Sequence, residues 1–201
     1  MQTLNSSLIA GLILAGGKAT RMGNRDKALV TLQGETLLSR AITRLRPQVG
    51  RLLLNANGDP ERFAAYGLPV VADSIGDHWG PLAGILAGLT YLAENRPEIS
   101  WLASVPTDCP FLPTDLVAQL ASAMIRHGAE LAVAESHGRL QPVFGLWPVT
   151  LADDLRRALI AGVRSVEHFA GAYRLARAAW PDEAFFNINT PDDLSQAARR
   201  L

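Results

Sequence analysis

Short apolar runs alternate along this chain with longer stretches in which apolar residues recur every three or four positions. The runs cover residues 8–14, 51–56, 69–72, 101–105 and 131–134, a length that suits buried strands. The longer stretches predict helices over about residues 36–46, 81–95 and 114–127, because their apolar side chains fall on one helical face. Strands that alternate with helices in this way predict a parallel sheet covered by helices on both sides.

The alternation changes after Glu135. A turn-forming segment at residues 136–139 precedes a return strand over residues 140–147, which we expect to be antiparallel, and helices follow near residues 151–161, 163–170 and 191–201. Pro81 and Gly128 mark the start of one helix and the end of another. No linker or repeat interrupts the pattern. We therefore expect one domain over residues 1–201, with a three-layer, doubly wound, mostly parallel α/β sheet of the Rossmann-like kind.

Composition narrows the classes of partner. The chain has 201 residues, of which 48% are hydrophobic and 19% charged, which suits a soluble core-forming domain. Its net charge is zero and no basic block occurs, so a nucleic-acid-binding surface is not expected. The run at residues 8–14 is too short to span a bilayer, and no Lys or Arg precedes it as in a signal peptide. A single cysteine, Cys109, excludes an internal disulfide, and no Cys/His cluster has zinc spacing. We expect a cytoplasmic protein that binds small molecules, with neither a nucleic-acid nor a membrane partner.

A glycine-rich segment directly follows the first apolar run. It reads Leu14-Ala-Gly-Gly-Lys-Ala-Thr-Arg-Met-Gly-Asn-Arg-Asp-Lys27. Adjacent Gly16 and Gly17 let the backbone approach a nucleotide, and Arg21 and Lys27 can neutralise phosphates. The glycine spacing matches neither a P-loop nor a dinucleotide fingerprint. The pattern therefore predicts a polyphosphate site of another type.

Two further charges of this segment have open interpretations. Lys18 and Lys27 are the two lysines of the chain, and we assign a phosphate contact to Lys27, whereas Lys18 suits a solvated surface charge equally well. Asp26 either orients Lys27 or forms an ordinary surface ion pair, and we favour the ion pair.

Polar residues also end the other predicted strands. In an open parallel sheet, ligands bind outside the carboxyl ends of the strands. The polar and small residues at these ends are Gly16, Gly17, Asn55, Asn57, Asp59, Asp73, Thr107 and Asp108. Each Asn or Asp by itself also suits a turn, and Asp108 suits a helix cap. Their joint placement at one edge is what predicts a site.

At this point the residues reach a resemblance. The segment from Leu14 to Lys27 resembles the signature of the molybdenum cofactor guanylyltransferases, within the nucleotide-diphospho-sugar transferase fold. Later motifs resemble the same family in the same order: Asn55-Ala-Asn, Asp73 before Gly80-Pro-Leu-Ala-Gly84, Pro-Thr-Asp108-Cys-Pro-Phe and Asn187-Ile-Asn-Thr-Pro-Asp-Asp-Leu194. The resemblance therefore spans nearly the whole chain.

The resemblance implies a set of roles. Leu14, Ala15 and Gly16 would lie against guanine. Lys27, Asn55 and Asp73 would contact GTP, and Asp108 would hold Mg²⁺ beside the GTP phosphates, in keeping with the preference of Mg²⁺ for carboxylate and phosphate oxygens. The pair Asn187 and Asn189 would bind molybdopterin, although an Asn before Thr190-Pro191 also suits an ordinary helix start.

The implied reaction is nucleotidyl transfer. The terminal phosphate of molybdopterin, with or without bound molybdenum, would attack the α-phosphorus of GTP and expel pyrophosphate. Arg21, Lys27 and Asp108 would act as the catalytic residues by positioning and charge neutralisation, so no side-chain nucleophile is needed and Cys109 is not one. The resemblance also implies proteins that deliver the cofactor, and molybdoenzyme chaperones that receive it.

Two rival interpretations stay open. One is a transferase of the same fold that joins CTP or another nucleotide to molybdopterin, or to a sugar or alcohol phosphate. Family members that use CTP tend to carry Leu-Ala-Ala-Gly where this chain has Leu14-Ala-Gly-Gly17, which favours GTP. The other rival is a non-catalytic carrier of nucleotide or cofactor, against which the combination of Lys27, Asp73 and Asp108 argues.

Overall fold

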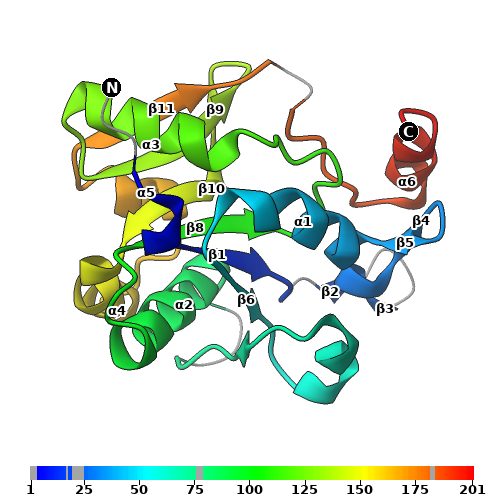
Figure 1. Cartoon of the computed structure of the whole chain (residues 1–201), viewed down its shortest axis with the longest axis horizontal. Coiled ribbons are helices and arrows are strands. Elements are labelled where there is room, and N and C mark those ends of the chain that lie inside the picture. Colours follow the sequence, from blue (N-terminus) through cyan, green and yellow to red (C-terminus); the bar gives the residue numbers. More distant parts are fainter. Residues whose placement is uncertain (1–3, 17, 20–24, 76–78, 182–183) are drawn as a thin grey trace.

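A seven-stranded sheet forms the middle layer of the molecule, in the order β11-β9-β10-β8-β1-β6-β7 (Figure 1). This computed structural model describes residues 4–16, 18–19, 25–75, 79–181 and 184–201. The strands of the sheet are β1 (Ile9–Leu14), β6 (Arg51–Asn55), β7 (Val70–Val71), β8 (Trp101–Pro106), β9 (Leu131–Ser136), β10 (Arg139–Pro148) and β11 (Leu175–Ala179). All neighbouring pairs are parallel except those of β10, which is antiparallel to both β8 and β9.

Helices cover both faces of the sheet. The helices α1 (Leu37–Leu45) and α3 (Leu116–His127) pack their buried side chains on one face, and α2 (Pro81–Asn95), α4 (Ala152–Ile160) and α5 (Val166–Ala170) pack on the other. Each face thus has its own apolar core, built from alternate residues of the same strands. The predicted three-layer, mostly parallel sheet is confirmed.

The remaining elements are short. Two small hairpins, β2–β3 (Lys18–Ala19 with Arg25–Asp26) and β4–β5 (Thr31–Leu32 with Glu35–Thr36), lie between β1 and α1 in the sequence. The short 3-10 helices are η1 (Ser6–Leu8), η3 (Lys27–Leu29), η4 (Arg46–Gln48), η5 (Pro60–Tyr66) and η6 (Val149–Leu151). The chain ends in α6 (Pro191–Ala198), which lies beside the β4–β5 hairpin in Figure 1.

A third, small apolar cluster holds the C-terminal segment in place. It consists of Leu32, Leu37, Ile188 and Ala197, and therefore joins the segment before α6 to the start of α1. The Ile188 N–H also donates to the Asp108 carbonyl oxygen at 2.9 Å. Residues near the end of the chain are thereby fixed next to the carboxyl ends of the central strands.

The sequence pattern missed one strand of the sheet. β11 reads Leu-Ala-Arg-Ala-Ala, and alanine has low strand propensity. The available signal was a period of two, since Ala176 and Ala178 are buried and Arg177 between them is exposed. The strands and helices that the pattern did predict agree with the structure to within a few residues: α2 has the predicted bounds, and Gly128 ends α3 in a left-handed conformation.

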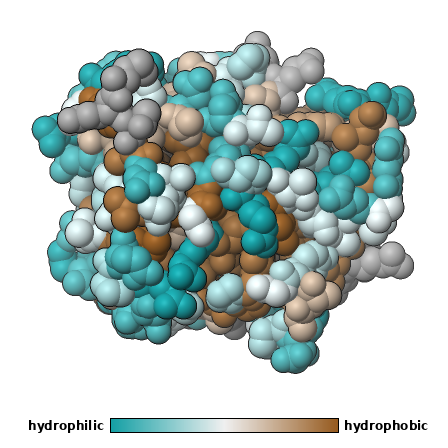
Figure 2. Space-filling model, in the orientation of Figure 1, coloured by the Kyte–Doolittle hydropathy of each residue, from teal (hydrophilic) through white to brown (hydrophobic). Residues whose placement is uncertain are grey.

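Polar side chains cover most of the face seen in Figure 2, with an apolar area exposed near its middle. Within the described residues, no helix combines the length and the apolar character that crossing a membrane requires.

Candidate active site

Three neighbouring strands of the sheet end side by side. Leu14 at the end of β1 lies opposite Asn55 of β6 and Pro106 of β8. The Ala15 N–H donates to the Asn55 carbonyl at 2.8 Å, and the Thr107 N–H donates to the Leu14 carbonyl at 3.2 Å. The glycine-rich segment therefore leaves the sheet between the residues that follow β6 and β8.

On the β8 side, three side chains form what we term the lysine cluster: Lys27, Asp108 and Asn189. The Lys27 ammonium donates to Asp108 Oδ2 at 2.6 Å and to Asn189 Oδ1 at 2.7 Å. The side chains of Lys27 and Asp108 are 12% and 21% exposed, so the ion pair is largely shielded from water. The cluster unites three segments that are remote in the sequence.

On the β6 side, Asn55, Asn57 and Asp73 form what we term the amide cluster. Asp73 accepts from Asn55 Nδ2 at 2.9 Å and from Asn57 Nδ2 at 2.8 Å, and its own N–H donates to Asn57 Oδ1 at 2.8 Å. Asn55 Nδ2 also donates to the Val71 carbonyl at 3.1 Å. Because Asn55 is only 4% exposed and its amide donates two hydrogen bonds, its side chain is held in one orientation.

The glycine at position 84 allows α2 to approach this cluster closely. A Cβ atom there would lie 2.3 Å from Asn55 Oδ1 and 2.6 Å from Leu14 Cδ2, closer than any side chain tolerates. At Gly16, by contrast, a Cβ would meet no atom of the described residues within 4 Å. The backbone after β1 thus faces open space. Gly17 and Arg21 lie outside the described residues.

Asp26 forms an ion pair with Arg62 rather than with its neighbour Lys27, and this pair is partly buried rather than an ordinary surface pair. Its Oδ2 accepts from Arg62 Nε at 2.9 Å, and its Oδ1 accepts from the Ala28 N–H at 3.1 Å as the N-cap of η3. The sequence interpretation did not single out Arg62. Its only local signal was an arginine three positions after the strand-end residue Asp59.

The segment before α6 does more than begin a helix. Thr190 is the N-cap, and Asp193 accepts from both the Asn189 and Thr190 N–H groups in a capping box. These hydrogen bonds, first of all that from Asn189, lower the pKa of the Asp193 carboxyl. Capping thus leaves the Asn189 side chain for Lys27. The Asn187 side-chain oxygen is buried, and none of the described residues donates a hydrogen bond to it.

The two residues after Thr107 have distinct environments. The Asp108 carboxylate contacts Lys27, while the N-cap of α3 is Asp115. Cys109 is buried, and its thiol lies 3.7 Å from the Ala184 carbonyl oxygen. Burial, reinforced by the negative charge of Asp108, raises the pKa of Cys109 from 9.0 to about 12. The thiol therefore stays protonated near neutral pH, as expected of a residue that is not a nucleophile.

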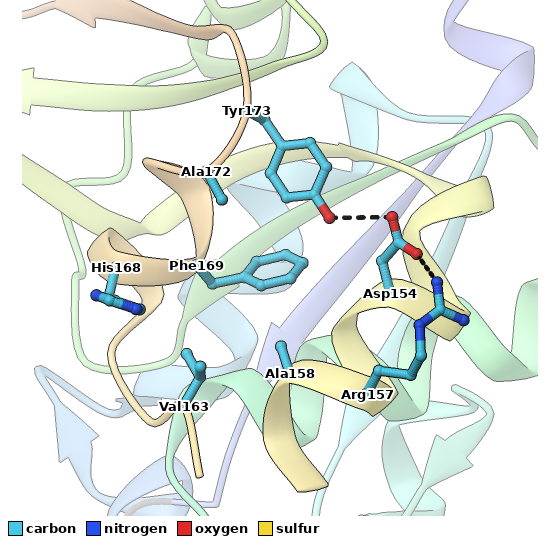
Figure 3. A pocket seen from close by; sticks show the side chains of 8 residues that line it. All are labelled: Asp154, Arg157, Ala158, Val163, His168, Phe169, Ala172 and Tyr173. Carbon is cyan, nitrogen blue, oxygen red and sulfur yellow. Dashed lines mark hydrogen bonds and ion pairs between the residues drawn. The ribbon is translucent and has the colours of Figure 1, made fainter. Parts of the chain in front are cut away.

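Where a metal ion would bind is restricted by the donor set. In the described part of the chain, no group of three or more His, Cys, Asp or Glu side chains converges. A hollow of about 250 Å³ between α4 and α5, shown in Figure 3, contains none of the predicted site residues. Its Tyr173 hydroxyl donates to Asp154 Oδ2 at 3.1 Å. The groups suited to phosphate and metal chemistry are those at the strand ends.

Fold and site together define a nucleotide-binding α/β protein. A mostly parallel sheet places Ala15 and Gly16, at the start of the glycine-rich segment, between a lysine–carboxylate pair and an amide-bound carboxylate, an arrangement suited to a nucleoside polyphosphate.

Comparison with known proteins identifies the family. Residues 11–178 match the family model described as the MobA-like NTP transferase domain. A molybdenum cofactor guanylyltransferase from a Bradyrhizobium species is 50% identical over 203 residues, which cover 99% of this chain and 96% of that protein. The chain therefore belongs to the molybdenum cofactor guanylyltransferases.

Solved structures share the fold at low identity. The molybdopterin-guanine dinucleotide biosynthesis protein A from Archaeoglobus fulgidus has a TM-score of 0.74 and 22% identity, with 95% of this chain and 97% of that chain covered. A 4-diphosphocytidyl-2C-methyl-D-erythritol synthase from Anaerococcus prevotii has a TM-score of 0.76 and 12% identity, with 97% and 96% covered. Because a protein named for a cytidyl product has this fold as well, the fold does not determine the nucleotide.

Proposed function

We propose that this protein transfers GMP from GTP to the terminal phosphate of molybdopterin, with or without bound molybdenum, and releases pyrophosphate. The product is the molybdopterin guanine dinucleotide cofactor. The observation that carries the proposal is 50% identity over 99% of the chain to a protein named molybdenum cofactor guanylyltransferase. The arrangement of the strand ends supports it, because Ala15 and Gly16, at the start of the glycine-rich segment, leave the sheet between two polar clusters that can both reach a nucleoside triphosphate.

In this proposal the amide cluster and the turn after β1 bind GTP. Leu14, Ala15, Gly16 and Gly17 lie against guanine and the adjoining backbone, while Asn55 and Asp73 hydrogen-bond to the nucleotide. The open space beside Gly16 supports a close approach of the ligand to the backbone. The fixed orientation of Asn55 supports recognition without reorganisation, since its amide is already held by Asp73 and the Val71 carbonyl.

We assign Mg²⁺ to Asp108. The donor set fits a metal that keeps water and takes phosphate oxygens, since one strand-end carboxylate suffices when the nucleotide supplies the other ligands. The metal would neutralise charge on the phosphates when bound. Lys27, now paired with Asp108, turns to the same phosphates, and Arg21 adds a second cation from the glycine-rich segment. No covalent intermediate is needed, because the acceptor brings its own phosphate.

We assign molybdopterin to the C-terminal segment. A pterin carries several N–H groups. The buried Asn187 oxygen is an acceptor to which no described residue donates, and an unsatisfied buried acceptor costs free energy until a ligand supplies a donor. The exposed Asn189 lies next to Lys27, so its amide would meet the acceptor close to the phosphates. Asn187 and Asn189 would therefore place the acceptor on the β8 side of the turn.

The test measures pyrophosphate release from each nucleoside triphosphate in the presence of Mg²⁺ and molybdopterin. We expect GTP to give turnover and CTP to give little. If CTP gave as much product as GTP, the guanylyl assignment would be wrong. Asp108→Asn should abolish turnover while the protein stays folded, because the metal loses its carboxylate. Near-normal turnover of that variant would overturn the metal assignment, and a wild-type protein that binds GTP tightly without turnover would be a carrier.

Three coarser proposals accompany this one. We treat residues 1–201 as a single domain, a proposal supported by the one sheet that strands from both halves of the chain build together. We place the reaction in the cytoplasm. We also propose that cofactor-delivery proteins and molybdoenzyme chaperones are partners, and that pull-down from cells with an active molybdenum pathway would recover them.

A further inference from the structure

Arg62 uses its whole guanidinium group to join segments that flank the candidate active site. Its Nε donates to Asp26 Oδ2 at 2.9 Å. One terminal nitrogen donates to the Asp59 carbonyl at 2.8 Å, and the other donates to the Asn57 carbonyl at 2.6 Å. These three bonds use all three nitrogens of the side chain.

The residues that Arg62 binds each lead to one of the two clusters. Asp26 directly precedes Lys27, the centre of the lysine cluster, and caps the short helix on which Lys27 lies. Asn57 makes two hydrogen bonds of 2.8 Å each to Asp73, and so belongs to the amide cluster. Arg62 is therefore a short bridge between the backbone that carries Lys27 and the backbone that holds Asp73.

The geometry of this bridge requires arginine. Its guanidinium carbon lies 4.6 Å from the centre of the Phe63 ring, which is itself buried, so the planar group rests against a fixed surface. A lysine ammonium is a point charge without the planar fork and could not reach the same three acceptors with the same directions.

The bridge contributes little to global stability. The Arg62 side chain is 31% exposed, and water that reaches an ion pair screens it and reduces what the pair adds to stability. Arg62 nevertheless makes three directed hydrogen bonds to two segments of the candidate site. Its main effect is therefore on the spacing between those segments. That spacing matters because a nucleotide held at both clusters must fit between them, so a change in the spacing weakens GTP binding.

We propose that Arg62 is a positioning residue that sets the distance between Lys27 and Asp73 for the triphosphate substrate. The inference rests on the proposed function, in which both clusters contact the same GTP. Arg62 itself does not touch substrate. It acts through Asp26 on the phosphate side and through Asn57 on the Asp73 side.

The test compares Arg62→Gln and Arg62→Lys with wild type and with a control, Arg174→Gln. Arg174 also pairs with a carboxylate, that of Glu130 at 3.4 Å, but on a more exposed part of the surface and away from both clusters. KM and kcat are measured separately for GTP and for molybdopterin, together with the melting temperature. We expect both Arg62 variants to raise the KM for GTP by about tenfold or more. The KM for molybdopterin, the melting temperature and the control variant should stay close to wild type.

A coupling measurement separates positioning from bulk structure. Asp26→Asn should reproduce the GTP effect in part, and the double variant with Arg62→Gln should be no worse than Arg62→Gln alone, because both changes break the same bridge. Unchanged KM for GTP in Arg62→Gln overturns the inference. So does an equal rise in both KM values with a lower melting temperature, since that pattern indicates a merely structural residue.

The proposed function and this inference fail in different ways. Wild-type turnover with GTP tests the proposed function alone, and the ratio of variant to wild type tests Arg62. If the wild type turns over CTP instead, the ratio of the KM of each Arg62 variant to that of the wild type is measured with CTP, and that ratio then tests the inference. A wild-type protein that neither binds nor turns over any nucleotide overturns both.

Discussion

Replacing Lys27 with methionine is expected to change metal binding and catalysis in opposite directions. In the ligand-free protein the Lys27 ammonium lies 2.6 Å from Asp108 Oδ2, the carboxylate that we assign to the metal. Lysine and metal ion therefore compete for one oxygen. Methionine keeps the length and the apolar stem of the side chain but removes the competing charge, so Asp108 becomes available to a cation.

The size of the effect follows from the geometry of the pair. A hydrogen bond between charged groups is worth about 1.5–3 kcal/mol, and the lower end applies because the two side chains are still 12% and 21% exposed. Since each 1.4 kcal/mol is a factor of ten, Lys27→Met should bind Mn²⁺ about tenfold more tightly than wild type in the absence of nucleotide. Turnover should fall by about 100-fold or more, because a cation that compensates phosphate charge is lost.

Both quantities are directly measurable. The spectroscopic signal of free Mn²⁺ gives metal affinity for nucleotide-free protein, and pyrophosphate release gives kcat/KM. Asn189→Ala keeps the Lys27–Asp108 pair and serves as a matched control with a much smaller change in Mn²⁺ affinity. Asp108→Asn should bind no Mn²⁺ at this position. The competition argument is refuted if Lys27→Met binds Mn²⁺ no more tightly than wild type.

The remaining predictions concern packing, GTP binding, the cysteine and a helix cap. Gly84→Ala should lower the free energy of unfolding by about 1–3 kcal/mol, because the new Cβ would lie 2.3 Å from Asn55 Oδ1. Gly16→Ala should weaken GTP binding and leave the free energy of unfolding unchanged. Denaturant titrations that gave both variants the same loss of stability would contradict this difference. Cys109→Ser should retain turnover. The free energy of unfolding of the wild type should fall as pH rises from 9.0 towards about 12, because the Cys109 thiol loses its proton in the unfolded chain before it does so in the folded protein. Denaturant titrations at pH 8 and pH 10 measure this fall. The part of the fall that Cys109 causes should be missing in Cys109→Ser. Thr190→Ala should cost about 1 kcal/mol by removing the α6 cap, and an unchanged unfolding midpoint would count against that role.

Much of the fold was predictable because its signals are local. Apolar runs and helical periodicity identified the central strands and the main helices, and the turn before β10 indicated the antiparallel return. β11 escaped because alanine-rich segments carry little strand signal, and only pairing with β9 makes it a strand.

The candidate site was predictable in part for a topological reason. Parallel strands end at the same edge, so Asn55 and Asp108 had to come near the turn after β1 once the sheet was parallel. That rule places backbones and does not choose side-chain partners. Asp26, adjacent to Lys27 in the sequence, binds Arg62, and Lys27 binds Asn189 from 162 positions away.

The sequence by itself thus determined the order of the layers, the edge at which polar residues gather and, through its motifs, the family. Only the tertiary structure decided that Lys27 joins Asp108 to Asn189, that Arg62 bridges the two clusters and that burial raises the pKa of Cys109. The physical reason is range. Periodicity and turn preference act between near neighbours, whereas a hydrogen-bond partner or a pKa depends on groups that only the packed chain brings within a few ångströms.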